Sequence, residues 1–138
     1  SKLPVGSSAK IISGEFIKDE GPVPFSKLHV HYNDHDIFVF PSSCENMPNI
    51  LIEAMASGLP IVCSDRGPMP EVLGDGGSYF NPDSIDSIVN ALELTIGNKL
   101  IRENKVERSF LSAQRFSWEK CASDTFSFIS SFDNTQAR

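Results

Sequence analysis

Residues 37–63 read IFVFPSSCENMPNILIEAMASGLPIVC and decide the fold of this 138-residue chain. The apolar runs at the two ends of the stretch, Ile-Phe-Val-Phe and Ile-Val-Cys, are typical of strands buried on both faces, as in a parallel sheet covered by helices. Between them, residues 48–57 are predicted to form a helix, because Pro48 is tolerated in a first turn and Gly58 ends the pattern. A strand, a helix and a strand in so short a stretch predict a right-handed βαβ unit.

The flanking sequence continues this alternation. Further strands are predicted at residues 11–12 and 78–80, and further helices at residues 25–33, 85–97 and 99–114 and after Ser117. The chain is therefore expected to be an α/β protein, with an open parallel sheet of about four strands and helices on both faces.

The chain is expected to contain one ordered unit. Residues 1–10 are interpreted as a poorly defined segment, residues 11–132 as one domain, and residues 133–138 as a frayed tail. The aromatic side chains of the last helix, among them Trp118 and Phe126, are expected either in the core or on a surface that meets an absent domain.

Composition excludes some classes of partner. The net charge of −6, with acids and bases mixed along the chain, argues against nucleic acid, which is held by clustered Lys and Arg. No apolar run approaches the roughly 18 residues of a membrane span, so no transmembrane segment is expected. Three cysteines in a chain of this size indicate reduced thiols and a cytoplasmic location, with the inner face of a membrane as a further location for a longer form.

Two carboxylates mark the expected site. Ligands of open parallel sheets bind beyond the carboxyl ends of the strands, where residues 41–47 lead into the N-terminus of the apolar helix. A helix N-terminus suits a phosphate. Glu45 stands before this terminus and Glu53 about one and a half turns into the helix. Both carboxylates repel phosphate, but both accept hydrogen bonds from hydroxyls, so the layout suits a nucleoside diphosphate sugar with its ribose diol on Glu53.

Structural roles for these residues remain open at this stage. Glu53 is equally well explained by an ion pair with a Lys or Arg, or by an exposed position at the helix edge, and a structural role is somewhat more favoured for Glu45. Asp65 and Arg66 either line the cleft or form a loop ion pair. Cys44 is expected to be a packed residue at the edge of the sheet. No metal site is expected, because the nearest candidates, His29 and His31, diverge on a helix.

The pattern FVFPSxxExMPNxLxEAMAxGxPIV, from Phe38 to Val62, resembles the C-terminal, donor-binding domain of the retaining GT-B glycosyltransferases of family four, a Rossmann-like fold. Its signature is two glutamates with seven residues between them. The segments DRGPxPEVL (65–73), GxxYFxP (76–82) and FSW (116–118) match the family as well, so the resemblance covers about residues 11–132.

The resemblance implies a role for each matching residue. Glu45 is the expected catalytic residue, in contact with hydroxyls of the transferred sugar, and Glu53 is expected on the ribose diol. The other expected donor-binding residues are Ser42, Asn46, Met47, Pro48, Asn49, Ile50 and Leu51. The implied reaction moves a hexose-type sugar from a nucleoside diphosphate sugar to an acceptor hydroxyl with retention of configuration, and it needs no cofactor and no metal.

The sequence departs from the family in two respects. Nothing before Ile11 matches the Gly-Arg…Lys-Gly segment that contacts the donor diphosphate, and the acceptor-binding domain is absent. The chain is therefore expected to be a fragment with little activity, whose longer form meets a glycan, lipid or small-molecule acceptor. One alternative is a nucleotide-binding or regulatory GT-B-like module without turnover. A receiver- or flavodoxin-type domain is disfavoured, because Ser42 and Ser64 stand where a receiver carries acidic residues.

Overall fold

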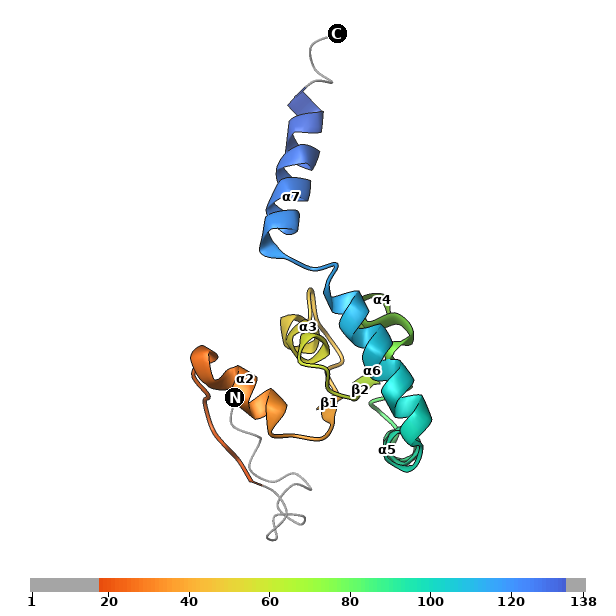
Figure 1. The fold of residues 1–138 in the computed structure, drawn as a ribbon. Coiled ribbons are helices and arrows are strands. Elements are labelled where there is room, and N and C mark those ends of the chain that lie inside the picture. The colour runs from red at the N-terminus through yellow and green to blue at the C-terminus, as the bar shows by residue number, and fades with distance from the viewer. Residues whose placement is uncertain (1–17, 134–138) are drawn as a thin grey trace.

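The computed structural model describes residues 18–133 (Figure 1). In chain order the elements are η1 (Phe25–Lys27), α2 (Leu28–Asn33), β1 (Phe38–Phe40), α3 (Asn49–Ala56), β2 (Ile61–Ser64), α4 (Met69–Leu73), η2 (Gly74–Gly76), β3 (Gly77–Phe80), α5 (Ile85–Gly97), α6 (Lys99–Ala113) and α7 (Trp118–Asp133). The strand predicted at residues 11–12 lies outside the described residues, as do the segment 1–10 and residues 134–138 of the predicted tail.

The sheet is open and parallel, as predicted. In residues 18–133 it has three strands, against about four expected for the whole chain, in the order β1-β2-β3, with Phe38 opposite Ile61 and Ile61 opposite Gly77. All four residues of the central strand β2 are buried. Such a strand needs cover on both faces, which explains why its sequence is a continuous apolar run rather than an alternating one.

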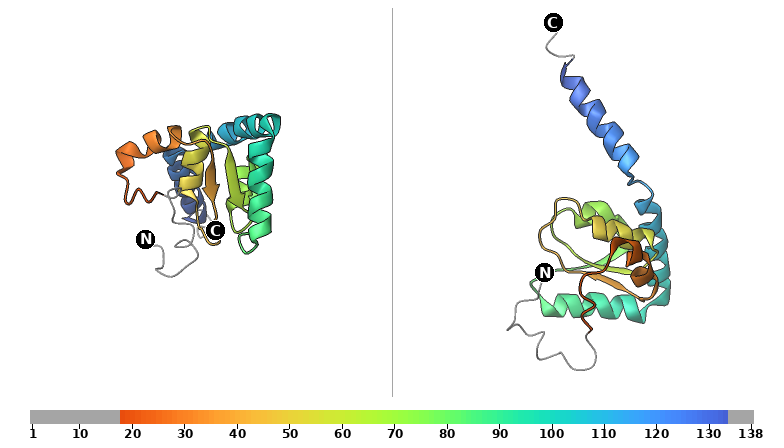
Figure 2. Two further views of the ribbon diagram at one scale, coloured as in Figure 1. Left: turned by 90° about the horizontal axis from the view of Figure 1, so that it is seen from below. Right: turned by 90° about the vertical axis from the view of Figure 1, so that its left-hand side faces the viewer.

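Helices cover both faces of the sheet (Figure 2). On one face, Ile61 and Cys63 of β2 pack in a cluster with residues of α3, α4 and α6, among them Leu51 and Met55. On the other face, Val62 packs with residues of β3 and α5. Full burial of a large apolar side chain stabilises the fold by about 1.5–3 kcal/mol relative to exposure, so these two clusters hold the strand ends, and any site built on them, in place.

Helix boundaries follow the local signals in the sequence. Gly58 follows α3 with a φ of 72°, a left-handed conformation that glycine adopts without steric cost. The Ser84 hydroxyl caps α5 by accepting a hydrogen bond from the Ser87 N–H at 3.3 Å. The Ser117 hydroxyl accepts from the Lys120 N–H at 3.1 Å, which confirms the cap predicted for α7.

The last helix does not join the core. α7 projects away from the sheet and its covering helices (Figures 1 and 2), and its side chains are exposed, with Trp118 at 78% and Phe126 at 70%. Of the two expectations for this aromatic face, burial in the core is therefore wrong, because amphipathic periodicity shows that a face is apolar but not what covers it. The other, a surface that meets an absent domain, stays a prediction. Within residues 18–133, no helix is both long and apolar enough to cross a bilayer.

Candidate functional site

Glu45 lies in the loop between β1 and α3, at the carboxyl end of β1. Its side chain is half-buried, and its Oε1 accepts a hydrogen bond from the Ser42 hydroxyl at 2.6 Å. The two residues are three positions apart in one loop, so the loop itself orients the carboxylate. Among the described residues Glu45 takes part in no ion pair, which leaves its charge without a neutralising partner.

Glu53 is half-buried on α3, and its partner comes from a distant part of the chain. The Tyr32 hydroxyl, on α2, donates a hydrogen bond to Glu53 Oε2 at 3.0 Å. No Lys or Arg in residues 18–133 forms an ion pair with Glu53, so the ion-pair explanation left open by the sequence does not hold for this part of the chain. The sequence predicted a helix at residues 25–33, which includes Tyr32, but did not predict this contact.

The hydroxyl of Tyr32 stays a hydrogen-bond donor at neutral pH. Burial, and then the hydrogen bond to the Glu53 carboxylate, raise the pKa of Tyr32 to about 12. Both causes disfavour the phenolate, since a negative oxygen would lie in a poorly hydrated place beside a carboxylate. The pair is therefore a fixed donor and acceptor rather than an acid and a base that exchange a proton.

The N-terminus of α3 carries no side-chain cap. Pro48 occupies the N-cap position and makes no side-chain hydrogen bond there, while the Asn49 N–H donates to the Met47 carbonyl at 2.9 Å and the Ile52 N–H to the Pro48 carbonyl at 3.1 Å. An α-helix leaves its first N–H groups unpaired and has a positive dipole end there. An uncapped first turn of this kind suits an anionic group.

The other predicted donor-binding residues differ in exposure. Asn46, Met47, Asn49 and Ile50 are exposed, and Ser42 is half-buried. Pro48 and Leu51 are buried, Leu51 with 0% of its surface accessible. These two residues therefore present no surface to a ligand in this structure, because they pack inward, and any role they have is to support the site from beneath. Contact of the exposed residues with a donor stays a prediction.

The loop after β2 contributes a cation that is already paired. Arg66 forms ion pairs with Asp65 at 3.4 Å and Asp83 at 3.1 Å, and its guanidinium donates to Asn81 Oδ1 at 3.0 Å. This confirms the loop ion pair that the sequence left as one of two explanations. The cluster is exposed, so its charges are screened by solvent.

The other candidates do not assemble into a site. Within residues 18–133, no group of three or more His, Cys, Asp and Glu side chains is placed to hold a metal ion. Cys44 is exposed, against the prediction that it packs at the edge of the sheet. Cys63 is buried, and burial raises the pKa of its thiol to about 12.

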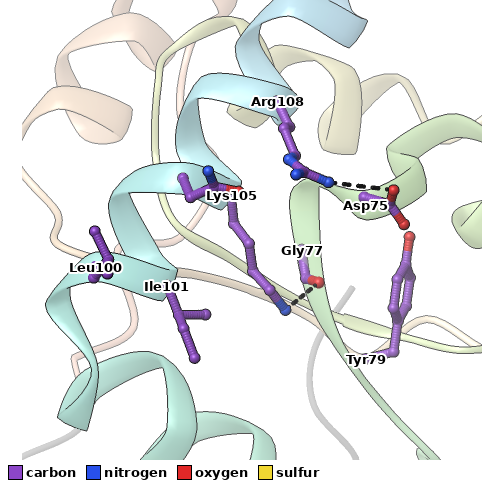
Figure 3. A pocket seen from close by; sticks show the side chains of 8 residues that line it. Asp75, Gly77, Tyr79, Leu100, Ile101, Lys105 and Arg108 are labelled. Carbon is purple, nitrogen blue, oxygen red and sulfur yellow. Dashed lines mark hydrogen bonds and ion pairs between the residues drawn. The ribbon is translucent and has the colours of Figure 1, made fainter.

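A cavity of about 720 Å³ lies elsewhere, between β3 and α6 (Figure 3). Of its polar lining side chains, all but that of Asn104 are already engaged within the chain. Lys105 Nζ donates to the Gly77 carbonyl at 2.7 Å, Arg108 pairs with Asp75 at 3.4 Å, and the Tyr79 hydroxyl donates to the Gly74 carbonyl. The list of lining residues is Asp75, Gly77, Tyr79, Leu100, Ile101, Asn104, Lys105 and Arg108. The cavity contains neither signature glutamate, and its bonds fasten α6 to the sheet.

Comparison with known proteins assigns the family. The family model described as glycosyl transferases group 1 matches residues 9–98, a range that contains both signature glutamates. The chain belongs to this family. The resemblance to the GT-B glycosyltransferases of family four is thus confirmed at the level of the family.

Individual relatives agree with this assignment. The chain is 34% identical over 110 residues to the O-antigen chain mannosyltransferase B of Escherichia coli, covering 80% of this chain and 29% of that protein. It is 27% identical over 114 residues to the sulfoquinovosyl transferase of Arabidopsis thaliana, covering 79% of this chain and 22% of that protein. The chain therefore spans less than a third of either relative.

A solved structure shows the same fold. Sucrose-phosphate synthase from Thermosynechococcus elongatus superposes with a TM-score of 0.73 at 22% sequence identity, covering 83% of this chain and 30% of that one. The α/β architecture expected from the sequence is confirmed by this likeness. The roles of individual residues in binding a donor are not tested by it and stay predictions.

Proposed function

We propose that this group 1 glycosyl transferase domain is the donor-binding part of an enzyme that moves a hexose-type sugar from a nucleoside diphosphate sugar to an acceptor hydroxyl, with retention of configuration. The observation that carries the proposal is the placement of Glu45 and Glu53. One stands before and one beyond the uncapped N-terminus of α3, neither is neutralised by a cation of the described residues, and each is held by one hydroxyl donor.

In this proposal the diphosphate lies at the N-terminus of α3 and the ribose diol on Glu53. An ionised carboxylate has about four lone-pair positions, and the Tyr32 hydroxyl occupies one of those on Glu53. The remaining positions are sufficient for two ribose hydroxyls. Each hydrogen bond to a charged group contributes roughly 1.5–3 kcal/mol, which offsets the cost of a half-buried carboxylate on an otherwise apolar helix.

Glu45 would act on the sugar side. Its loop follows β1 directly, so its carboxylate is held at the carboxyl end of the sheet, ahead of the helix that would hold the diphosphate. The first N–H groups of α3 would stabilise the negative charge that develops as the diphosphate leaves. Catalysis would rest on this stabilisation and on the positioning of the donor, and the proposal includes no metal and no cofactor.

The acceptor would be bound by parts of the protein that this chain does not contain. We place the acceptor, whether a glycan, a lipid or a small molecule, on a second domain. The uncovered apolar face of α7 is the surface that we expect to contact this second domain. Trp118, Phe128 and Phe132 on this helix are each at least 60% exposed. The proposed location is cytoplasmic, with the inner face of a membrane for the full-length protein.

Calorimetric titration of the full-length protein with UDP, GDP and ADP tests the nucleotide side of the proposal. Glu53→Ala should weaken binding of the preferred nucleotide about ten- to a hundredfold, the equivalent of roughly 1.5–3 kcal/mol. Glu93→Ala, on the exposed surface of α5, removes the same charge from the other face of the sheet and should leave affinity unchanged. Unchanged affinity in Glu53→Ala would remove this residue from the ribose.

Turnover tests the sugar side. Glu45→Ala should lower the rate of sugar transfer more than it weakens binding of the free nucleoside diphosphate, because the lost contact is to the sugar. Equal losses in both measurements contradict a sugar-side role. A wild-type protein that binds nucleotide and consumes no donor sugar with any acceptor would instead favour the regulatory module without turnover.

A further inference from the structure

We propose that Tyr32 is a positioning residue of the donor site, which fixes the Glu53 carboxylate so that its free acceptor positions face the ribose hydroxyls. The inference rests on the proposed function and deepens it. The contact joins α2 to α3 over 21 positions in the sequence, with the Tyr32 hydroxyl 3.0 Å from Glu53 Oε2. The two helices are therefore linked at the residue that would hold the ribose.

The ring of Tyr32 is itself held in place. It packs against the core cluster beneath α3 and meets the ring of Phe38 edge-on, with the ring centroids 6.1 Å apart. Phe38 in turn stacks on Phe40, at 5.8 Å. Phe38 and Phe40 both lie on β1, so the ring of Tyr32 packs against a strand of the sheet, and this packing fixes the position from which its hydroxyl contacts Glu53. A donor of this kind orients a flexible side chain because its own rotamer is locked by packing.

The Glu53 carboxylate has no other fixed support. Within residues 18–133, the Tyr32 hydroxyl is the only side-chain group that hydrogen-bonds to this carboxylate, and no cation pairs with it. A hydrogen bond from a neutral hydroxyl orients the charge without neutralising it. It uses one acceptor position on Oε2, and no hydrogen-bond donor of the described residues meets Oε1. A Lys or Arg in the same position would satisfy the charge and compete with the ribose.

The phenyl ring and the hydroxyl of Tyr32 have separable roles, which makes the inference testable. Packing against Phe38 and the core depends on the ring alone, whereas orientation of Glu53 depends on the oxygen. Tyr32→Phe removes the oxygen and keeps the ring. If the role of Tyr32 were purely structural, this substitution would change the affinities for a nucleotide with the ribose diol and for one without it by the same factor.

The experiment compares two ligands in the full-length protein. The tightest-binding of UDP, GDP and ADP is titrated calorimetrically, together with its 2′,3′-dideoxy form, which lacks the ribose diol. Tyr32→Phe should weaken binding of the ribonucleotide about fivefold to tenfold and leave that of the dideoxy form unchanged. Tyr79→Phe is the matched control, since the Tyr79 hydroxyl, on the strand at the opposite edge of the described sheet from β1, donates to the Gly74 carbonyl, and the substitution should change neither affinity.

The same titrations separate failure of this inference from failure of the proposed function. If Glu53→Gln weakens ribonucleotide binding, Tyr32→Phe combined with it should cost nothing further, because both changes remove one interaction. A full additive loss in the double variant, no loss in Tyr32→Phe, or equal losses for both ligands overturns the role of Tyr32 and leaves Glu53 on the ribose. Unchanged affinity in Glu53→Gln, or a wild-type protein that binds none of the three nucleotides, overturns both.

Discussion

Ser109 on α6 offers a prediction whose sign is unusual. The residue is fully buried, and its hydroxyl has no hydrogen-bond partner among the described residues. A buried polar group without a partner costs about 1–3 kcal/mol, and Ser is slightly less favourable than Ala inside a helix. Ser109→Ala removes both penalties and loses the packing of one oxygen atom. We therefore expect the substitution to stabilise the chain by about 1–2 kcal/mol, although most substitutions at buried positions destabilise.

Urea unfolding followed by far-UV circular dichroism measures this change. Fluorescence is a poor reporter, because Trp118 is already 78% exposed in the folded chain. Ser112→Ala is the matched control: it lies on the same helix but is only half-buried, so it reports helix propensity without relief of a fully buried hydroxyl. A Ser109→Ala variant that is less stable than wild type, or that gains no more than Ser112→Ala, would refute the reasoning.

Three further predictions concern packing, thiol reactivity and pH. Gly76→Ala should destabilise the chain by about 3 kcal/mol in urea unfolding, because the new Cβ would lie 2.7 Å from a backbone carbon of α6. The new Cβ of the control variant Gly97→Ala would meet no atom within 4 Å, so this substitution should change stability little. A thiol reagent at pH 8 should label Cys44 and Cys121 quickly and Cys63 only upon unfolding, and rapid labelling of all three would contradict the burial of Cys63. Burial raises the pKa of that thiol from 9.0 to about 12, so the unfolded chain loses the proton first and stability should fall as the pH rises above about 9. The half-buried Tyr32 and Tyr79, whose pKa values are also raised, act in the same direction, so an unchanged urea midpoint between pH 8 and pH 10 would count against this.

The secondary structure was predictable wherever local signals agreed. The helix predicted at residues 48–57 is observed as Asn49–Ala56, and the strand predicted at residues 61–63 as Ile61–Ser64. Apolar runs of that length, bounded by Pro and Gly, leave few alternatives. The exposure of α7 was not predictable, because its periodicity is the same whether its apolar face is covered by this chain or by another part of the protein.

The site was predictable in part. The positions of Glu45 and Glu53 relative to α3 follow from spacing and from the order of strand, loop and helix. The hydrogen-bond partners of the two glutamates differ in how far they lie along the chain. Ser42 is in the same loop as Glu45, whereas Tyr32 is 21 positions from Glu53 and contacts it only when α2 packs against α3. The burial of Leu51 was equally hidden, since the sequence does not tell which side of an almost wholly apolar helix turns toward the core.

The central strand β2 is held on both faces, by one cluster under α3, α4 and α6 and by another under α5. Local unfolding of the helices on one face therefore leaves the strand packed against the helix or helices on the other face. Its amide hydrogens should be the slowest to exchange with solvent, and those of α7 among the fastest. The loop of Glu45 follows β1, an edge strand of the described sheet, so its amide hydrogens should exchange faster than those of β2.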